Sequence, residues 1–294
     1  MRTGRKSLPN WASCPIEARP PTTHKGGRKG SDCLGYRSLS IEADIILIQR
    51  LAAAADRAVA PYFRAQTPVE QKADHSPVTA ADRAAETVIR TILGTDRPTD
   101  GIYGEEYGVS RGRSGRMWVI DPIDGTRGFI AGRPLYGTLI ALVEDGRPIL
   151  GLISAGAAGD RWLGCTVGQP RAVLNGKPIR TRSCPGLSLA RAGSTHPLAF
   201  SAAGHAAFQR VGRSVADMLF GGDCHNYGLL AAGQLDLVME ENLKPYDWAA
   251  LVPVIEGAGG LITDWKGKPL TLASEGRVLA AGDARVHAEA MERI

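Results

Sequence analysis

The order of helix-like and strand-like segments changes once along the chain, and this change narrows the folds that it can adopt. Between residues 117 and 180, short apolar segments follow one another through turn signals such as Asn175-Gly176, a pattern typical of an antiparallel meander. After about residue 185, strands and helices alternate, which favours an α/β layer. We therefore predict two closely packed halves, an α+β half at residues 39–184 and an α/β half at 185–294.

Two helices are expected to open the folded part. Apolar residues three and four apart predict helices over 42–64 and 79–94, joined by a Pro-containing loop at 65–78. The strands expected in the first half are 117–120, 136–143, 148–154, 161–167 and 171–180. In the second half we expect a strand at 190–194, helices at 199–214 and 224–233, a strand at 235–240, a helix at 246–257 and a strand at 260–264.

The basic charge of the chain is concentrated at one end. Residues 1–38 hold eight Lys or Arg and two acidic residues, which leaves 27 basic and 28 acidic residues in 39–294. The segment is rich in Pro, Gly, Ser and Thr and has no apolar periodicity, so we predict a disordered basic tail. The segment could be a transit peptide, the product of a start codon assigned too far upstream, or a dispensable extension. The neutral body argues against nucleic-acid binding.

Cysteine, histidine and hydropathy patterns limit the remaining classes. The five cysteines contain no C-x-x-C pair, and no apolar stretch reaches the length of a membrane span. We therefore expect a reduced, cytoplasmic protein without a membrane segment. The histidines show no metal-ligand spacing, and we expect His75, His196 and His225 to be loop or surface residues.

Two carboxylates follow the apolar segment 117–120 directly. Asp121 and Asp124 flank Pro122, which cannot continue a strand ladder, and Gly125-Thr126 can begin a helix. Carboxylates at a strand end beside a helix N-terminus can hold a cation and an oxyanion together. The alternative is an ordinary Asp-Gly turn.

Other acids extend this pattern. Glu105 lies in a loop 16 residues before Asp121, and Asp247 opens an apolar helix, where it could simply cap that helix. If these acids converge, each pair about 4 Å apart costs roughly 4 kcal/mol at an effective dielectric near 20. Convergence therefore implies bound cations, and all-oxygen ligands imply Mg²⁺ or Mn²⁺ rather than zinc.

The chain resembles the inositol monophosphatase superfamily of Mg²⁺-dependent phosphatases. The resemblance covers residue 42 to the C-terminus. It is carried by Gly104-Glu105-Glu106, by DPIDGT at 121–126, by the Asp-Trp-Ala-Ala segment at 247–250 and by the segment 72–82. It implies an αβαβα sugar-phosphatase-like fold, a homodimer, two or three Mg²⁺ ions and a small phosphorylated metabolite as substrate. Mn²⁺ could replace Mg²⁺.

The resemblance also implies roles for individual residues. The metal ligands would be Glu105, Asp121, Asp124, Asp247 and the Ile123 carbonyl. The amides of Gly125 and Thr126 would hold the substrate phosphate, and Thr126, Asp82 and Glu105 would orient and deprotonate a water molecule. Asp82 is also explained by a helix capping box that begins at Thr79. Lys72 would lie near a weakly held cation, or it is a solvated loop residue.

Within the superfamily, three stretches resemble histidinol-phosphatases of the inositol monophosphatase type, namely 101–108, 220–233 and 243–260. The resemblance implies that Asp223 pairs with the substrate ammonium and that Glu240 contacts the substrate; a turn is the alternative account of Asp223. We expect metal-dependent hydrolysis of histidinol phosphate. The alternatives are a phosphatase for inositol or another sugar phosphate, and a non-catalytic metal-binding regulator on the same scaffold.

Overall fold

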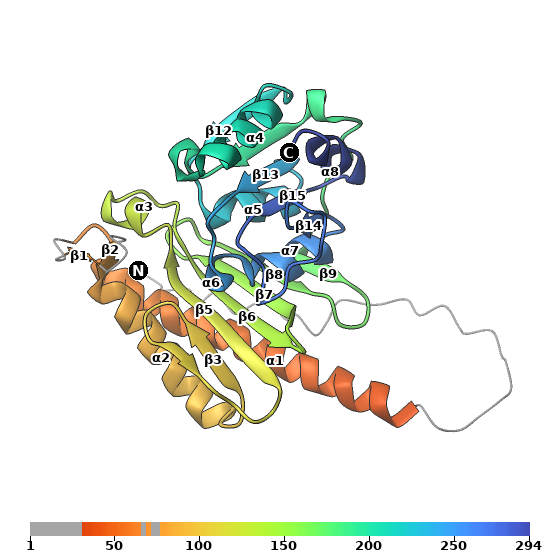
Figure 1. The fold of residues 1–294 in the computed structure, drawn as a ribbon. Coiled ribbons are helices and arrows are strands. Elements are labelled where there is room, and N and C mark those ends of the chain that lie inside the picture. The colour runs from red at the N-terminus through yellow and green to blue at the C-terminus, as the bar shows by residue number, and fades with distance from the viewer. Residues whose placement is uncertain (1–30, 66–68, 72–76) are drawn as a thin grey trace, which may run out of the picture.

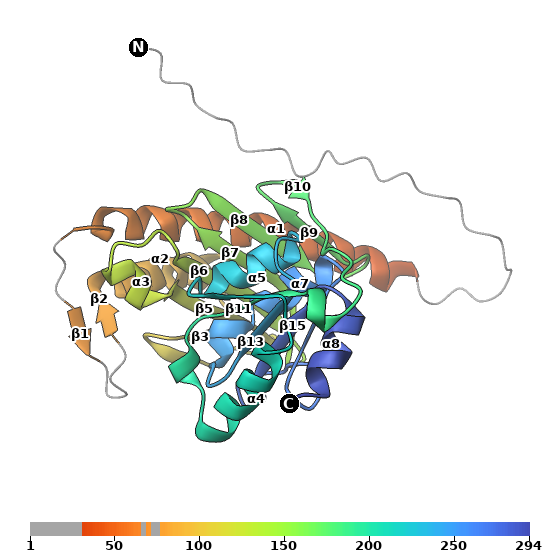
Figure 2. The same ribbon diagram turned by 90° about the horizontal axis from the view of Figure 1, so that it is seen from above.

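The computed structural model describes residues 31–65, 69–71 and 77–294, and it consists of alternating helical and sheet layers (Figures 1 and 2). Helices α1 and α2 cover the outer face of an eight-stranded sheet. Helices α5 and α7 lie between this sheet and a five-stranded sheet, whose far side carries α4 and α8. The predicted αβαβα arrangement is confirmed.

The eight-stranded sheet has the strand order β10-β9-β8-β7-β6-β5-β3-β4. All its neighbours are antiparallel except β3 and β5, which are parallel. The elements of this half are α1 (Ser31–Val59), the 3₁₀ turn η2 (Ala60–Tyr62), β1 (Val69–Gln71), β2 (Pro77–Thr79), α2 (Ala80–Asp96), β3 (Gly101–Gly104), β4 (Gly108–Ser110), β5 (Arg116–Asp124), α3 (Thr126–Ile130), β6 (Gly137–Glu144), β7 (Arg147–Ala155), β8 (Asp160–Cys165), β9 (Arg171–Leu174) and β10 (Lys177–Pro178).

The five-stranded sheet has the order β12-β11-β13-β15-β14, with β11 parallel to both of its neighbours. The elements of this half are η3 (Leu187–Leu189), β11 (Arg191–Ser194), η4 (Pro197–Ala199), α4 (Ala202–Gly212), β12 (Asp217–Phe220), α5 (Cys224–Ala231), β13 (Leu237–Glu240), α6 (Pro245–Trp248), α7 (Leu251–Gly257), β14 (Leu261–Thr263), β15 (Val278–Ala281) and α8 (Ala284–Met291).

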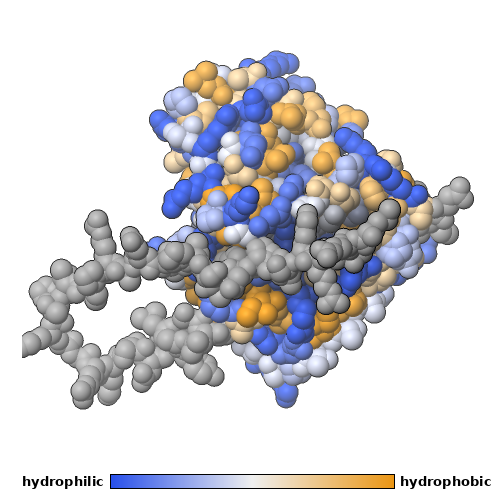
Figure 3. Space-filling view, turned by 180° about the vertical axis from the view of Figure 1, so that it is seen from behind, coloured by the Kyte–Doolittle hydropathy of each residue, from blue (hydrophilic) through white to orange (hydrophobic). Residues whose placement is uncertain are grey.

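Strand β6 is apolar from Leu139 to Val143 because both of its faces are covered. Leu139 and Ala141 face the inner core shared with α5 and α7, whereas Ile140 and Leu142 face the core under α1 and α2. A strand that is covered on both faces is apolar at every position instead of alternating. The surface differs: Figure 3 shows hydrophilic and hydrophobic residues interspersed outside the part that the grey atoms cover.

Most predicted elements are found, with several corrections. Helix α1 begins at Ser31, so its first turns fall inside the segment 1–38 predicted to be a disordered tail. Once a helix has formed, extending it costs little because each added residue gains a hydrogen bond. Residues 1–30 lie outside the described part of the chain. Strands β1 and β2 pair within the predicted loop 65–78.

Two prolines alter predicted boundaries. The strand predicted at 117–120 runs on to Asp124, with a register shift around Pro122, which has no N–H to donate. The helix predicted at 246–257 is divided into α6 and α7, because Pro253 cannot donate to the carbonyl of Ala249. Elements β3, β4, β12, β15 and α8 were not predicted, and none of the helices in the described chain is long and apolar enough to cross a membrane.

Candidate active site

Acidic residues from three separate segments meet at the C-terminal end of β5. Carboxylate oxygens of Asp121, Asp124 and Asp247 lie within 4.8 Å of one another. Asp121 and Asp124 end β5, and Asp247 comes from α6. Glu105 follows β3, the parallel neighbour of β5, and its amide donates to the Ile120 carbonyl over 3.1 Å. The structure therefore brings together acids that are up to 142 residues apart in the sequence.

The turn after β5 is held by short-range hydrogen bonds. The Ile123 amide donates to Asp121 Oδ1 over 3.0 Å, and the Thr126 hydroxyl donates to the Ile123 carbonyl over 2.9 Å. Gly125 has a φ of 82° and begins α3, so the predicted helix start after Asp124 is confirmed. This backbone conformation favours glycine.

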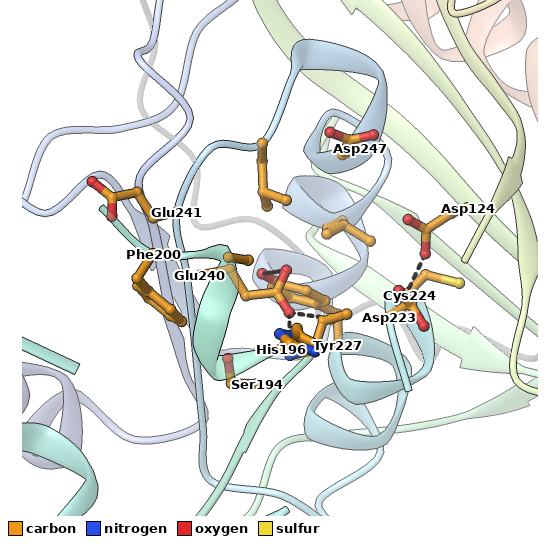
Figure 4. Close-up of a pocket in the computed structure, with 14 residues that line it drawn as sticks. Asp124, Ser194, His196, Phe200, Asp223, Cys224, Tyr227, Glu240, Glu241 and Asp247 are labelled. Carbon is orange, nitrogen blue, oxygen red and sulfur yellow. Dashed lines mark hydrogen bonds between the residues drawn. The ribbon is translucent and has the colours of Figure 1, made fainter. Parts of the chain in front are cut away.

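The other two carboxylates are each fixed by a backbone amide. Asp124 Oδ2 accepts from the Cys224 amide over 2.6 Å (Figure 4). Asp247 Oδ2 accepts from the Lys244 amide over 2.6 Å. Asp247 therefore caps α6, as the simpler sequence interpretation suggested, and its carboxylate also faces Asp121 and Asp124. The capping role and a ligand role are compatible, because a cap sets the direction of the carboxylate.

Burial and mutual repulsion dominate the electrostatics of this corner. Burial, and then the charges of Glu105 and Asp124, raise the pKa of Asp121 well above its usual value. Burial raises the pKa of Asp124 and brings the pKa of Asp247 to about 7. Within the described residues, Asp121, Asp124 and Asp247 form no ion pair with Lys, Arg or His. Converging carboxylate oxygens that no described residue pairs as an ion fit a divalent cation.

Asp82 forms the capping box that the sequence predicted. The Thr79 amide and hydroxyl donate to Asp82 Oδ2 over 2.8 and 2.7 Å. Burial raises the pKa of Asp82, and the charge of Glu105 also acts to raise it, which places Asp82 beside the acidic corner. Lys72 lies outside the described residues.

A cavity of about 110 Å³ extends from the acidic corner into the second half of the molecule (Figure 4). Asp223 and Glu240, which the resemblance implied as substrate contacts, both line it. The lining comprises Asp124, Ser194, Thr195, His196, Ala199, Phe200, Asp223, Cys224, Tyr227, Glu240, Glu241, Leu243, Asp247 and Leu251. The cavity therefore joins the end of β5 to residues of β11, η4, α5 and β13.

Glu240 is a buried carboxylate with three donors. Its Oε1 accepts from the Thr195 amide over 2.9 Å and from the Thr195 hydroxyl over 2.5 Å, and its Oε2 accepts from the Tyr227 hydroxyl over 3.3 Å. Burial nevertheless raises its pKa to about 7. These contacts hold the carboxylate against the cavity wall in one orientation.

Asp223 has an unusual backbone, with a φ of 47° immediately before α5. Its carboxylate lies against the Gly125 turn, where a Cβ built on Gly125 would come within 3.2 Å of it. Burial raises the pKa of Asp223 to about 6, although the nearby charge of Arg133 lowers it. The turn alternative is thus correct about the backbone, and the side chain also borders the cavity.

Sequence reasoning missed most of the far wall of the cavity. Thr195 and Phe200 belong to no recognisable motif, and Tyr227 lies in the stretch 220–233 but was not predicted to line the site. The position of all three residues depends on the packing of β11 beside β13. His196 was expected to be a loop or surface residue, and it is exposed, but it also lines the cavity. His225 was predicted wrongly: it is buried in α5, 4% exposed, beside Trp162.

The sequence of this chain is similar to those of known phosphatases. The family model described as the inositol monophosphatase family matches residues 42–294. A relative from Arabidopsis thaliana, named bifunctional phosphatase IMPL2, chloroplastic, is 46% identical over 253 residues, covering 83% of this chain and 72% of the relative. A protein named histidinol-phosphatase from Mycobacterium tuberculosis is 35% identical over 262 residues, covering 85% of this chain and 97% of the relative.

Solved structures show the same fold. An inositol monophosphatase from Zymomonas mobilis has 50% sequence identity and a TM-score of 0.79, covering 86% of this chain and 97% of that chain. These relatives favour an enzyme over the non-catalytic regulator that the sequence alone left open. The chain belongs to the inositol monophosphatase family of phosphatases.

Proposed function

We propose that this phosphatase hydrolyses histidinol phosphate in a Mg²⁺-dependent reaction. The observation that carries the proposal is the charge of the cavity. The described lining of the cavity contains no Lys or Arg. Five of its residues carry carboxylates, namely Asp124, Asp223, Glu240, Glu241 and Asp247. An ester that carries an ammonium group gains electrostatic attraction from such a wall, whereas an uncharged polyol gains little.

The carboxylates are not equally available to a ligand. Glu241 is tied to the Ser201 amide and to Arg277, which lower its pKa on balance although burial opposes ionisation. Asp223 lies between the Gly125 turn and the cavity, close to the acidic corner. An ammonium group near a phosphate bound at that corner is therefore within reach of Asp223. The relative named histidinol-phosphatase supports the same substrate.

Inositol phosphate is the second candidate. It is favoured by the 50% identity to the inositol monophosphatase of Zymomonas mobilis. The two candidates differ in charge, since inositol is neutral, so the same carboxylate wall would affect their binding differently.

In the proposed site, Glu105, Asp121, Asp124, Asp247 and the Ile123 carbonyl would hold two or three Mg²⁺ ions, which Mn²⁺ could replace. A divalent cation supplies shielding of the phosphate charge and makes a bound water more acidic. The amides of Gly125 and Thr126 would bind phosphate oxygens at the start of α3.

Asp82, Thr126 and Glu105 would orient and deprotonate the attacking water. Asp82 is suited to accept a proton because burial raises its pKa. The water oxygen forms a new bond to phosphorus while the ester P–O bond breaks, and the leaving alkoxide takes up a proton to become the alcohol. The chain needs no covalent phosphoenzyme for this displacement.

We also propose that the protein is reduced and cytoplasmic and that it forms a homodimer. The three cysteines with described side chains, Cys165, Cys184 and Cys224, are free and buried, which supports a reducing environment. The boundary between the α+β half and the α/β half at residue 184 is also a prediction.

A panel of phosphate esters tests the substrate. Purified protein is assayed for phosphate release from histidinol phosphate, inositol 1-phosphate and glycerol 2-phosphate, with Mg²⁺ and with EDTA. We expect Mg²⁺-dependent turnover with the largest kcat/KM for histidinol phosphate. A preference for inositol 1-phosphate would replace the first candidate with the second, and equal rates in EDTA would contradict the metal requirement.

A further inference from the structure

The cavity has a second end, opposite the acidic corner, that the proposed reaction does not use. Ser194 ends β11, His196 and Phe200 lie on the short segment between β11 and α4, and all three line the cavity. Figure 4 shows Phe200 on the far side of Glu240 from Asp124 and Asp247, with Ser194 and His196 below Glu240. A phosphate ester with its phosphate at the acidic corner would extend its leaving group toward this end.

A backbone contact selects the tautomer of the His196 imidazole. Its Nδ1 accepts a hydrogen bond from the Leu198 amide over 3.0 Å, which caps η4. A neutral imidazole that accepts at Nδ1 must carry its proton at Nε2. The Nε2–H of this exposed residue forms no hydrogen bond with any described residue, so a donor is left for a ligand in the cavity.

The surroundings of His196 suit a flat polar ring. Phe200 is held by stacking on Phe208, with ring centroids 4.6 Å apart and an interplanar angle of 25°. The hydroxyl of Ser194 is buried and has no hydrogen-bond partner among the described residues. A buried hydroxyl without a partner costs about 1–3 kcal/mol, so a polar group in this end of the cavity would be stabilised.

We propose that His196 is a specificity-determining residue that donates a hydrogen bond from Nε2 to an acceptor nitrogen of a heteroaromatic ring on the leaving group, with Phe200 as the neighbouring aromatic wall. The inference rests on the proposed function and adds to it: the carboxylates attract the ammonium group, and His196 recognises the ring. A neutral imidazole on the substrate offers one acceptor nitrogen, which matches the single donor of His196. Inositol has no aromatic ring to place beside Phe200.

The capping bond of His196 gives a competing, purely structural account, and two variants separate the accounts. His196→Ser keeps a side-chain oxygen that can cap η4, but it removes the imidazole. His196→Ala removes both the cap and the imidazole. If His196 is only a cap, KM for histidinol phosphate should rise in the alanine variant alone. If His196 determines specificity, this KM should rise equally in both variants.

Steady-state kinetics on both variants, with Mg²⁺ present, test the inference. For histidinol phosphate we expect KM to rise about 5- to 10-fold in both variants, the effect of one lost hydrogen bond, with kcat within twofold of wild type. For glycerol 2-phosphate, kcat/KM should stay within twofold. His287→Gln, on α8 and outside the cavity lining, is the matched control and should leave both substrates unaffected.

A binding measurement complements the kinetics. Histidinol, which lacks the phosphate, should inhibit glycerol 2-phosphate hydrolysis competitively, and its inhibition constant should rise in both His196 variants. The inference is overturned if KM for histidinol phosphate is unchanged in His196→Ser, or if both esters lose activity equally. A wild-type protein that leaves histidinol phosphate intact overturns the proposed function itself, so the two failures are distinguishable.

Discussion

Single residues at the acidic corner are oriented before any cation binds. Asp124 and Asp247 each accept a backbone N–H over 2.6 Å, and Ile123 donates to Asp121. Such contacts fix the direction of a carboxylate at little cost, since the backbone is already ordered. The side chains therefore lose little further freedom on binding a ligand.

Replacing Asp124 by Asn tests the corner directly. We expect Asp124→Asn to lower kcat/KM by more than about 100-fold, since several kcal/mol of charge stabilisation depend on the cation. The fold should persist, because the amide oxygen can still accept from Cys224. Phosphate-release assays and thermal unfolding with and without Mg²⁺ measure both effects. Asp145→Asn, in an exposed turn with a φ of 51°, is the control; retained activity in Asp124→Asn would exclude the proposed ligand set.

Asp223 allows its charge to be tested without changing its backbone. Asn tolerates positive φ nearly as well as Asp, so Asp223→Asn keeps the conformation and removes the charge. We expect KM for histidinol phosphate to rise about 5- to 10-fold, as for a lost charged contact of about 1 kcal/mol, while kcat/KM for inositol 1-phosphate is unchanged. An equal loss on both esters would show that Asp223 supports the site without recognising an ammonium group.

At the scale of secondary structure, the site exists because elements end in the same place. Strands β3 and β5 are parallel, so Glu105 and Asp121 leave the sheet at one edge, and α6 begins opposite them. The helix α7 that follows lies against β7 and β8. The position of Asp247 thus depends on how closely this helix approaches the sheet.

Two glycines permit that approach. Gly151 and Gly164 are paired on β7 and β8, and a Cβ at Gly164 would come within 2.1 Å of the Pro253 carbonyl oxygen of α7. We expect Gly164→Ala to destabilise the protein by about 1–3 kcal/mol or more. Gly94→Ala, in α2 with no atom near the new methyl group, should instead stabilise by up to about 1 kcal/mol. Urea unfolding compares them, and equal stabilities would contradict the close packing.

The acids that meet at these element ends make metal-free stability depend on pH. The pKa of Asp247 is about 7 in the folded state against 3.8 ordinarily. The folded protein therefore binds this proton more tightly, and its contribution to stability is present below pH 3.8 and lost as pH rises through 7. In EDTA, the melting temperature should fall from pH 5 to pH 8, and less steeply in Asp247→Asn.

Mg²⁺ should reverse this loss, with a larger stabilisation at pH 8 than at pH 5, because protons compete with the cation for the same oxygens. Thermal unfolding of wild type and Asp247→Asn across this pH range provides the test. Parallel pH profiles for the two proteins in EDTA would show that Asp247 does not titrate as expected.

At the scale of the whole molecule, three apolar clusters follow the layers. One lies under α1 and α2, one between the sheets, and one beneath α4 and α8. The cavity crosses from the first half to the second, so the halves must stay packed together for the site to exist. The outer helix α1 contributes to a core and has no residue in the cavity lining.

Two truncations separate these contributions. Deleting residues 1–30 should leave kcat/KM within twofold of wild type, since every described residue of the cavity and the acidic corner lies after residue 81. Deleting residues 1–52 removes Ile45, Ile48 and Leu51, which are at most 1% exposed, and should prevent stable folding. Activity assays and circular dichroism report the outcome. A large loss in the shorter deletion would mean that residues 1–30 take part in the reaction.

Much of the secondary structure is determined by residues that are neighbours in the sequence. The capping box of Thr79 and Asp82, the Asn175-Gly176 turn and the apolar run of β6 each depend on neighbours in sequence, and each was predicted. The edge strand β12 was not, because an exposed four-residue strand has no burial pattern to distinguish it from a loop. The position of DPIDGT at the end of a strand was also readable, since an apolar segment precedes it.

The sequence by itself determined the identity of the acids, the secondary structure beneath them and their order along the chain. Only the tertiary structure decided that Asp247 faces Asp121 and Asp124, and that His196 and Glu240 share a cavity with Asp124 and Asp247. These relations depend on the pairing of β11 with β13 and on the close approach of α7 to β7 and β8. Contacts between distant segments follow from the simultaneous packing of all layers, which no local pattern of residues records.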